Sequence, residues 1–361
     1  MKRVIQTLAA MAAVGIITGA AIVFGGLYNV SARAGHFPGV TWLLHTAYVN
    51  SVQFRAPAMA DVPDLDADGM VALGARHFDG GCRVCHAAPG QDRWAVPTAM
   101  VPKPPHIQTA VAGWNVNELY WIVDEGVKMS GMPHWPADRT DDVWPVVAFL
   151  AQVPDMTQAE YDALTARPRI SDDAPDDLAY CAMCHGVTGF STNPQIPRLD
   201  IQPRRYLEQA LQSYVNQTRD SGIMHVAASR VSPAALMELA EWYSRQPVVP
   251  SAMSSPADAE LMAYGARLAS AGTRDVPACT SCHGPKAGPQ SADFPRLAGQ
   301  SRIYLEQQLT LWRDGERGGG PRAELMQKAA HQLTEDKIKA LSAWFSAQPA
   351  MNPEPNSSED G

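Results

Sequence analysis

The chain has 361 residues, a length typical of two or three domains, and a formal net charge of −8. This acidic balance argues against nucleic-acid binding, which relies on basic surfaces. All six cysteines fall into three C-x-x-C pairs, so none is left over for a disulfide.

The first segment has the pattern of a membrane-spanning helix. Lys2 and Arg3 are followed by no charged residue from position 4 to 32, and the apolar stretch 8–28 reaches the length of about 20 residues that crosses a bilayer core. We predict a membrane anchor over residues 1–32 with its basic end in the cytoplasm. The alternative is a secretory signal cleaved at Ala32-Arg33-Ala34, but signal peptides have apolar regions of only about 7–15 residues.

Residues 33–65 form a predicted membrane-proximal segment. Leu44, Tyr48 and Val52 fall on one face of a helix in this segment. Trp42 and Tyr48 suit a membrane interface, where aromatic side chains gather. The same face could instead pack on the domain that follows, and both interpretations stay open.

The motif C-x-x-C-H then occurs three times. It is the attachment motif for c-type haem, in which two thiols form thioether bonds to the vinyl groups and the histidine is the proximal iron ligand. A thioredoxin-like motif would need a neighbouring βαβ pattern, and a zinc ribbon needs its two pairs within about 15–20 residues. These pairs are 99 and 98 positions apart. The predicted attachment residues are Cys82, Cys85, Cys181, Cys184, Cys279 and Cys282, and the predicted proximal ligands are His86, His185 and His283.

Three covalently bound haem c groups are therefore expected. In bacteria this attachment takes place outside the cytoplasm, which agrees with the predicted orientation of the anchor. We predict a location in the bacterial inner membrane, with a single N-terminal pass and the haem domains in the periplasm.

The last two motifs belong to a duplicated domain. An offset of 98 takes Cys181 to Cys279 and Pro197-Arg198-Leu199 to Pro295-Arg296-Leu297, while an offset of 102 takes Met224 to Met326. The change in offset falls near 318–321.

Each of the three units is predicted to run helix, motif, long loop, helix, methionine loop and helix. The predicted domains cover residues 66–165, 171–248 and 256–350, with linkers over 156–173 and 247–256 and a disordered tail over 351–361.

Each iron also needs a distal ligand, and methionine is a common choice in cytochromes c. Met132, Met224 and Met326 occupy equivalent places before the final helix of each unit and are the predicted distal ligands. Met129 is a weaker alternative to Met132. The competing histidines are His134, His225 and His331, which lie close to the three methionines.

The proximal histidines need a hydrogen-bond acceptor for their second ring nitrogen. Pro105, Pro197 and Pro295 are placed in turns that could supply a backbone carbonyl. Arg198 and Arg296 are candidates for binding haem propionates.

These residues resemble two known families. Residues of about 173–350 resemble dihaem cytochrome c4 through C-x-x-C-H-G, Pro-Arg-Leu, Tyr-Leu-Glu-Gln, the two methionines and a closing helix with Trp-Tyr or Trp-Phe. Residues of about 22–165 resemble membrane-anchored monohaem cytochromes c of proteobacteria through Gly-Leu-Tyr-Asn-Val, Trp-Leu-Leu and Lys-Met-Ser-Gly-Met-Pro. The whole chain is thus similar to a membrane-anchored trihaem c-type cytochrome.

The resemblance implies an all-α fold of three class I cytochrome c domains in tandem behind an N-terminal transmembrane helix, with His/Met ligation at each iron. It implies a periplasmic electron-transfer protein with no catalytic residues of its own. Such a protein would relay single electrons in a respiratory chain, from a quinol-oxidising complex or dehydrogenase to a terminal oxidase or another acceptor. Alternatively, it would be the electron-outlet subunit of a multi-subunit periplasmic dehydrogenase. A haem sensor or peroxidase is a third, less favoured possibility, because it requires an open iron site.

Overall fold

The computed structural model describes residues 1–128, 130–250, 258–284 and 292–350. Within these ranges the chain is helical, with only two isolated β-bridges and no β-strand. The expected all-α fold is therefore confirmed. The predicted tail 351–361, Met129 and most of the predicted linker 247–256 lie outside the described residues.

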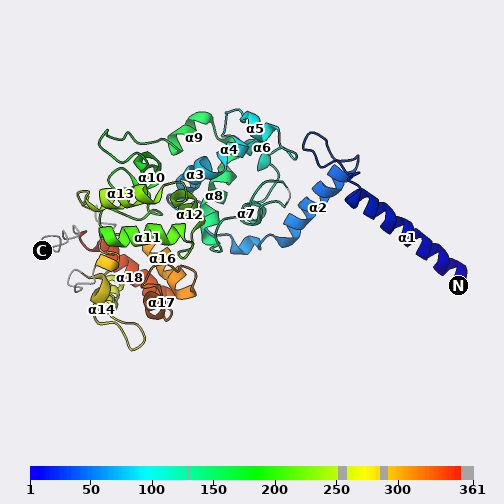
Figure 1. The fold of residues 1–361 in the computed structure, drawn as a ribbon. Helices are drawn as coiled ribbons and strands as arrows, with labels where there is room; N and C mark the ends of the chain where they lie inside the picture. Colours follow the sequence, from blue (N-terminus) through cyan, green and yellow to red (C-terminus); the bar gives the residue numbers. More distant parts are fainter. Residues whose placement is uncertain (129, 251–257, 285–291, 351–361) are drawn as a thin grey trace.

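Two helices lead into the body of the molecule (Figure 1). Helix α1 (Lys2–Phe24) is fully exposed and, by length and composition, could cross a membrane, with a mean hydropathy of 2.2 in its most apolar window. Helix α2 (Val40–Arg55) packs against α7, where the rings of Tyr48 and Trp114 lie 5.5 Å apart and Val52 is fully buried. The C-terminal part of the predicted helical face, with Tyr48 and Val52, thus packs on the next domain, while Leu44 remains 52% exposed.

Three separate hydrophobic cores follow, one in each predicted domain, which we call domains 1, 2 and 3. In domain 1 the core is built where α3 crosses α8. Gly74 allows this close approach, because a Cβ there would lie only 1.8 Å from the carbonyl oxygen of Pro145. The elements of domain 1 are α3 (Met70–Gly81), α4 (Arg83–His86), α5 (Ala95–Thr98), α6 (Ile107–Ala110), α7 (Val116–Glu125), η2 (Asp141–Val143), α8 (Trp144–Gln152), η3 (Val153–Asp155) and α9 (Gln158–Leu164).

Domains 2 and 3 share the packing of their later helices, but the helix expected before the motif is a separate element only in domain 3, because in domain 2 the motif itself lies inside the first helix. Their final helices pack on the helices that follow the long loop, α13 on α11 and α18 on α16. The elements of domain 2 are α10 (Leu178–His185), α11 (Arg204–Val215), α12 (Gly222–Ala228) and α13 (Pro233–Ser244). Those of domain 3 are α14 (Ala259–Ala271), α15 (Thr280–His283), α16 (Arg302–Asp314), α17 (Ala323–Ala330) and α18 (Glu335–Ala347).

Two local expectations were wrong. The methionine segments of domains 2 and 3 are short helices rather than loops, because Met224 lies in α12 and Met326 in α17. The predicted linker 156–173 begins with helix α9, which a Thr157–Glu160 capping box starts. Tyr161 anchors this helix, since its ring packs against Phe78 and Phe149 and its hydroxyl donates a 2.8 Å hydrogen bond to Asp79.

Domain 1 is packed against domain 2. Helix α3 contacts both α10 and α12. The amide of Asn193 donates to the carbonyl of Gly69 and that of Gln195 to the carbonyl of Asp68, both at 2.9 Å. Gln195 also accepts a hydrogen bond from Gln307, so this one side chain of domain 2 bonds to both domain 1 and domain 3.

A buried histidine at this junction should make stability depend on pH. Burial, and then the charge of Arg230, lower the pKa of His77 from 6.5 to about 4. Because the unfolded chain binds the proton more tightly, the free energy of unfolding should fall as the pH drops from 6.5 towards 4. The full shift of the His77 pKa corresponds to a change of about 3 kcal/mol in the free energy of unfolding. Guanidinium unfolding of the haem-loaded protein at several pH values in this window measures the effect.

The matched variants are His77→Gln and His36→Gln. The first should remove this part of the pH dependence, whereas the second replaces an exposed histidine and should leave it unchanged. Equal pH dependence in the parent and in His77→Gln would contradict the assignment.

Candidate haem sites

Each motif histidine is the last residue of a helix. His86 ends α4, His185 ends α10 and His283 ends α15. The helical turn brings the first cysteine of each motif next to the histidine four residues later, and none of the six cysteines forms a disulfide. Burial raises the pKa of Cys181 to about 12 and that of Cys279 to about 11, so these thiols are neutral at pH 7.

An equivalent hydrogen bond orients the ring of each of the three histidines. Nδ1 lies 2.9 Å from the Pro105 carbonyl oxygen for His86, 3.4 Å from that of Pro197 for His185, and 2.9 Å from that of Pro295 for His283. A carbonyl oxygen only accepts, so Nδ1 carries the proton and Nε2 presents its lone pair, the state that an iron ligand requires. The expected role of the three prolines is confirmed.

Burial also favours the neutral form of these rings. It is the main cause that lowers the pKa of His185 to about 4, and it lowers the pKa of His86 and His283 below the ordinary value. The three imidazoles are thus neutral at pH 7.

A cavity of about 600 Å³ joins the sites of domains 2 and 3, and residues of domain 1 such as His77, Arg139 and Asp142 also line it. Eight of the twelve predicted site residues line it, so the structure brings the motif and the methionine of each of domains 2 and 3 to one space. These residues are Cys181, Cys184, His185, Met224, Cys279, Cys282, His283 and Met326.

Of the four site residues of domain 1, Cys85 and His86 lie in α4, Cys82 directly precedes this helix, and Met132 lies in a loop. Cys82 packs against that core, and the charge of neighbouring Cys85 contributes to its raised pKa after the larger effect of burial. Met132 lies in a tight loop, in which its carbonyl oxygen accepts a 3.1 Å hydrogen bond from the Val127 amide. The loop turns at Gly131, whose φ of +84° favours glycine.

The competing distal histidines are committed to other partners. His225 uses Nδ1 on the Tyr214 carbonyl at 2.9 Å and Nε2 on Gln217 at 2.7 Å. His331 is bound at both nitrogens by Lys328 and Gln332, and His134 contacts the Trp135 carbonyl through Nδ1. These contacts favour the methionines as distal ligands.

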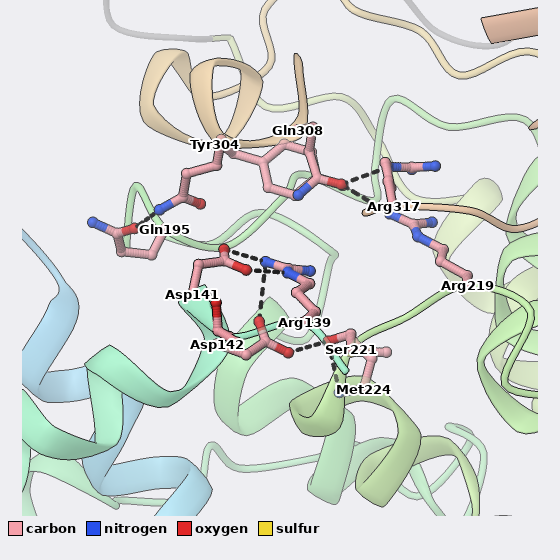
Figure 2. A network of polar contacts seen from close by, with 12 residues as sticks. Arg139, Asp141, Asp142, Gln195, Arg219, Ser221, Met224, Tyr304, Gln308 and Arg317 are labelled. Carbon is pink, nitrogen blue, oxygen red and sulfur yellow. Dashed lines mark hydrogen bonds and ion pairs between the residues drawn. The ribbon is translucent and has the colours of Figure 1, made fainter. Parts of the chain in front are cut away.

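Sequence reasoning missed two buried arginines beside the cavity. Arg219 and Arg317 line it, and neither forms an ion pair with any residue that the structure describes. Gln308 accepts from both guanidinium groups, and Arg219 also donates to Tyr206 and Tyr304 (Figure 2). Burial would raise the pKa of Tyr206, but the two arginines lower it below its ordinary value.

Two buried positive charges without a carboxylate are costly, and an anion entering the cavity would offset that cost. Haem propionates are such anions, and they accept charge-assisted hydrogen bonds from arginine. The donor set therefore fits haem. A signal for these residues was present in the sequence, because the repeat offset of 98 also takes Arg219 to Arg317.

Arg198 and Arg296, the candidates for binding propionates, line the cavity, but both also contact groups of the protein. Arg198 is buried in an ion pair with Asp200, with Nε 3.0 Å from the carboxylate, and stacks over Phe190. Arg296 donates to the Gly284 carbonyl at 3.1 Å. The equivalent of Asp200 in domain 3 is Ala298, so the acid that binds Arg198 has no counterpart there.

Domains 2 and 3 meet through a symmetric pair of glutamines. The amide of Gln202 donates to the Arg296 carbonyl and accepts from its N–H, both at 2.9 Å. Gln300 makes the same two contacts with Arg198, at 3.1 and 2.8 Å. Each side-chain amide thus pairs with the backbone of the opposite domain as a peptide group would.

A zinc site receives no support in the described ranges, where no cluster of three or more His, Cys, Asp or Glu could hold a metal ion.

Two family models match the chain. The model for cytochrome c oxidase, cbb3-type, subunit III matches residues 69–150, and the model for cytochrome c matches residues 262–348. Each match covers one motif domain and its proposed ligands.

Curated relatives cover about half of the chain. The "thiosulfate dehydrogenase electron acceptor" of Thiomonas intermedia is 37% identical over 181 residues, which is 49% of this chain and 82% of the relative. Cytochrome c4 of Pseudomonas aeruginosa is 32% identical over 46% of this chain and 83% of its own length. The crystal structure of reduced recombinant cytochrome c4 from Pseudomonas stutzeri is matched with a TM-score of 0.43 at 32% identity, over 49% of this chain and all of that chain.

The glutamine pair gives a direct test of the junction between domains 2 and 3. Replacing both Gln202 and Gln300 with Ala leaves buried backbone groups unpaired, and each lost pairing should cost about 1–3 kcal/mol of unfolding free energy. We expect the double variant to unfold at lower guanidinium concentration, with domains 2 and 3 separating before either domain unfolds. Gln212→Ala is the control, because Gln212 is exposed and bonds only to Asn216 one helical turn away. A double variant as stable as this control would show that the pairing does not hold the domains together.

Proposed function

We propose, on the premise that this chain belongs to the cytochrome c family, that it is a membrane-anchored, periplasmic trihaem cytochrome c that relays single electrons. Membership of the family implies covalent haem c. The number of haems, the ligands and the location are our proposal.

The observation that carries the proposal is the repeated histidine contact. In all three domains a C-x-x-C-H motif ends a helix and its histidine Nδ1 contacts a proline carbonyl oxygen. One such contact could arise from loop packing alone. Three of them, in domains whose sequences differ, are expected where three imidazoles must be held neutral and oriented for iron.

The protein would hold, orient and insulate the haems, which supply the one-electron chemistry. Each cysteine pair would bind a haem by thioether bonds, with the histidine as proximal ligand and Met132, Met224 or Met326 as distal ligand. Methionine as distal ligand raises the reduction potential relative to histidine. Arg219 and Arg317 would bind propionates at the shared cavity of domains 2 and 3.

Helix α1 would anchor the chain in the inner membrane. It is apolar, exposed over its whole length and begins with two basic residues, Lys2 and Arg3. In this arrangement α2 would link the anchor to domain 1, with Trp42, 70% exposed, at the membrane interface. Removal of α1 as a signal would instead release a soluble periplasmic carrier.

Two kinds of partner fit an electron carrier of this form. The first is a membrane-bound respiratory complex, with a quinol-oxidising complex or dehydrogenase as donor and a terminal oxidase as acceptor. The second is a periplasmic dehydrogenase for which this chain would be the electron outlet. The name of the relative from Thiomonas intermedia favours the second kind and suggests a thiosulfate-oxidising enzyme as its specific form.

The number of haems can be counted directly. The intact mass of the purified protein should exceed the polypeptide mass by three haem groups. A Cys181→Ala/Cys184→Ala variant should lose one of them, and Cys279→Ala/Cys282→Ala should lose another. Cys82→Ala/Cys85→Ala completes the series and tests domain 1. A parent protein with fewer than three haems would contradict the proposal, and the same masses show whether residues 1–32 are retained.

Purification in mild detergent from the native membranes, followed by mass spectrometry, identifies the partners. Oxidase or quinol-oxidising subunits in fixed proportion would support the respiratory relay. A dehydrogenase subunit in fixed proportion would support the electron outlet. The control is the same purification from cells that carry a chain without residues 1–32 behind a cleavable signal, which separates membrane proximity from true association. Recovery only with proteins unrelated to electron transfer would contradict both functions.

A further inference from the structure

The methionine segments of domains 1 and 2 are in direct contact. Trp135 follows Met132 by three residues, and Gly222 precedes Met224 by two. The indole of Trp135 lies so close to Gly222 that a Cβ on this glycine would be 2.3 Å from Nε1 and 2.5 Å from Cε2. Only glycine allows this approach, so the two segments touch with no side chain between them.

Trp135 is held in place from both domains. It is 4% exposed and belongs to the core of domain 1, and its amide donates a 2.7 Å hydrogen bond to the Asp124 carbonyl. The neutral ring of His77 packs against it with ring centroids 4.8 Å apart. From domain 2, Ile223 packs into the same core.

A buried polar network fixes the position of α12 on domain 1. The hydroxyl of Ser221 donates a 2.7 Å hydrogen bond to Asp142, whose carboxylate is paired with Arg139 at 3.0 Å (Figure 2). The same hydroxyl accepts from the amide of Met224 at 3.3 Å. The segment that carries the proposed distal ligand of domain 2 is therefore hydrogen-bonded to domain 1 through Ser221.

Among the described residues the buried indole N–H of Trp135 has no hydrogen-bond partner. Close packing against Gly222 and His77 holds the ring in its position.

From this contact we infer that electrons cross between domain 1 and domain 2 through the Trp135–Gly222 contact. Domain 2 is then the central carrier, between domain 1 on one side and domain 3 at the shared cavity on the other. In each crossing one electron leaves a ferrous iron, which becomes ferric, and reduces a ferric iron to ferrous, with no proton transferred and no bond made or broken. The physical reason is that tunnelling decays more steeply across empty space than through bonded or closely packed atoms. This inference rests on the proposed function, since it requires redox centres in both domains.

The test follows an electron introduced into domain 1. A ruthenium photosensitiser on a cysteine introduced at exposed Val96 reduces domain 1 after a laser flash. The concentration-independent passage to domains 2 and 3 is followed by haem absorbance and by freeze-quenched EPR. We expect Trp135→Leu to slow this passage several-fold and Trp135→Phe, which keeps an aromatic ring, to slow it less. Reduction potentials and haem content should be unchanged.

Gly222→Ala tests the contact without touching the tryptophan, because the added Cβ must push the two segments apart. It should also slow the passage several-fold, and it should increase hydrogen exchange of the α12 amides, a readout that does not depend on electron transfer. Trp114→Leu is the matched control. This tryptophan also packs on the core of domain 1 but faces Tyr48 of α2, so its loss should leave the rate unchanged.

Unchanged rates in both Trp135→Leu and Gly222→Ala, with three haems bound, would overturn the inference, as would a slowing fully accounted for by shifted potentials. Failure of the proposed function looks different, because the parent protein itself would then lack three haems or would not be reduced after the flash.

Discussion

The hydrogen bond from each motif histidine to a proline carbonyl is the constraint around which each domain is built. It ties the helix that carries the thiols to a loop 12 or 19 residues further along the chain. The loop must therefore turn back across the proximal side of the site, and the next long helix begins after it. In domain 2 the residues that follow this proline also include Arg198 and Gln202, which form the junction with domain 3. One contact thus orients the imidazole and places the surface on which the neighbouring domain is built.

The two junctions between domains differ in symmetry. Domains 2 and 3 share a near-symmetric interface of amide pairs, with the buried charges of Arg219 and Arg317 at one cavity. Domain 1 meets domain 2 through packing of Trp135 and Ile223, the Ser221–Asp142 hydrogen bond and the amide-to-carbonyl bonds of Asn193 and Gln195, none of which has a symmetric partner. The symmetric junction is the kind expected between two copies of one domain. The junction of domains 1 and 2 joins two different surfaces, which fit together in one orientation.

The parts of the structure that follow from local chemistry could be predicted from the sequence. The motifs locate the thiols and histidines, and the repeat offset identifies the methionines and the prolines, because each of these residues has a fixed neighbour along the chain. The apolar patterns likewise predicted α3, α7 and α8. What could not be predicted depends on how side chains pack in the folded chain. Helix α9 forms where a linker was expected, because the Thr157–Glu160 capping box starts it and Tyr161 is buried against Phe149 and against Phe78, which is far away in the sequence. Arg198 was a candidate for binding a propionate because Asp200, two residues on, was not recognised as its partner.

The contact at Gly222 also determines which of the two duplicated domains binds domain 1. At the repeat offset of 102, the three residues Ser221, Gly222 and Ile223 correspond to Ala323, Glu324 and Leu325 in domain 3. The hydroxyl that binds Asp142 is therefore missing there, and a glutamate stands where only glycine lets the indole approach. The counterpart of the isoleucine that packs into domain 1 is 52% exposed. Two copies of one domain offer two similar surfaces on which domain 1 could dock. Because the sequences of the two copies differ at this helical turn, only the surface of domain 2 binds domain 1. The order of the three domains in space is therefore fixed.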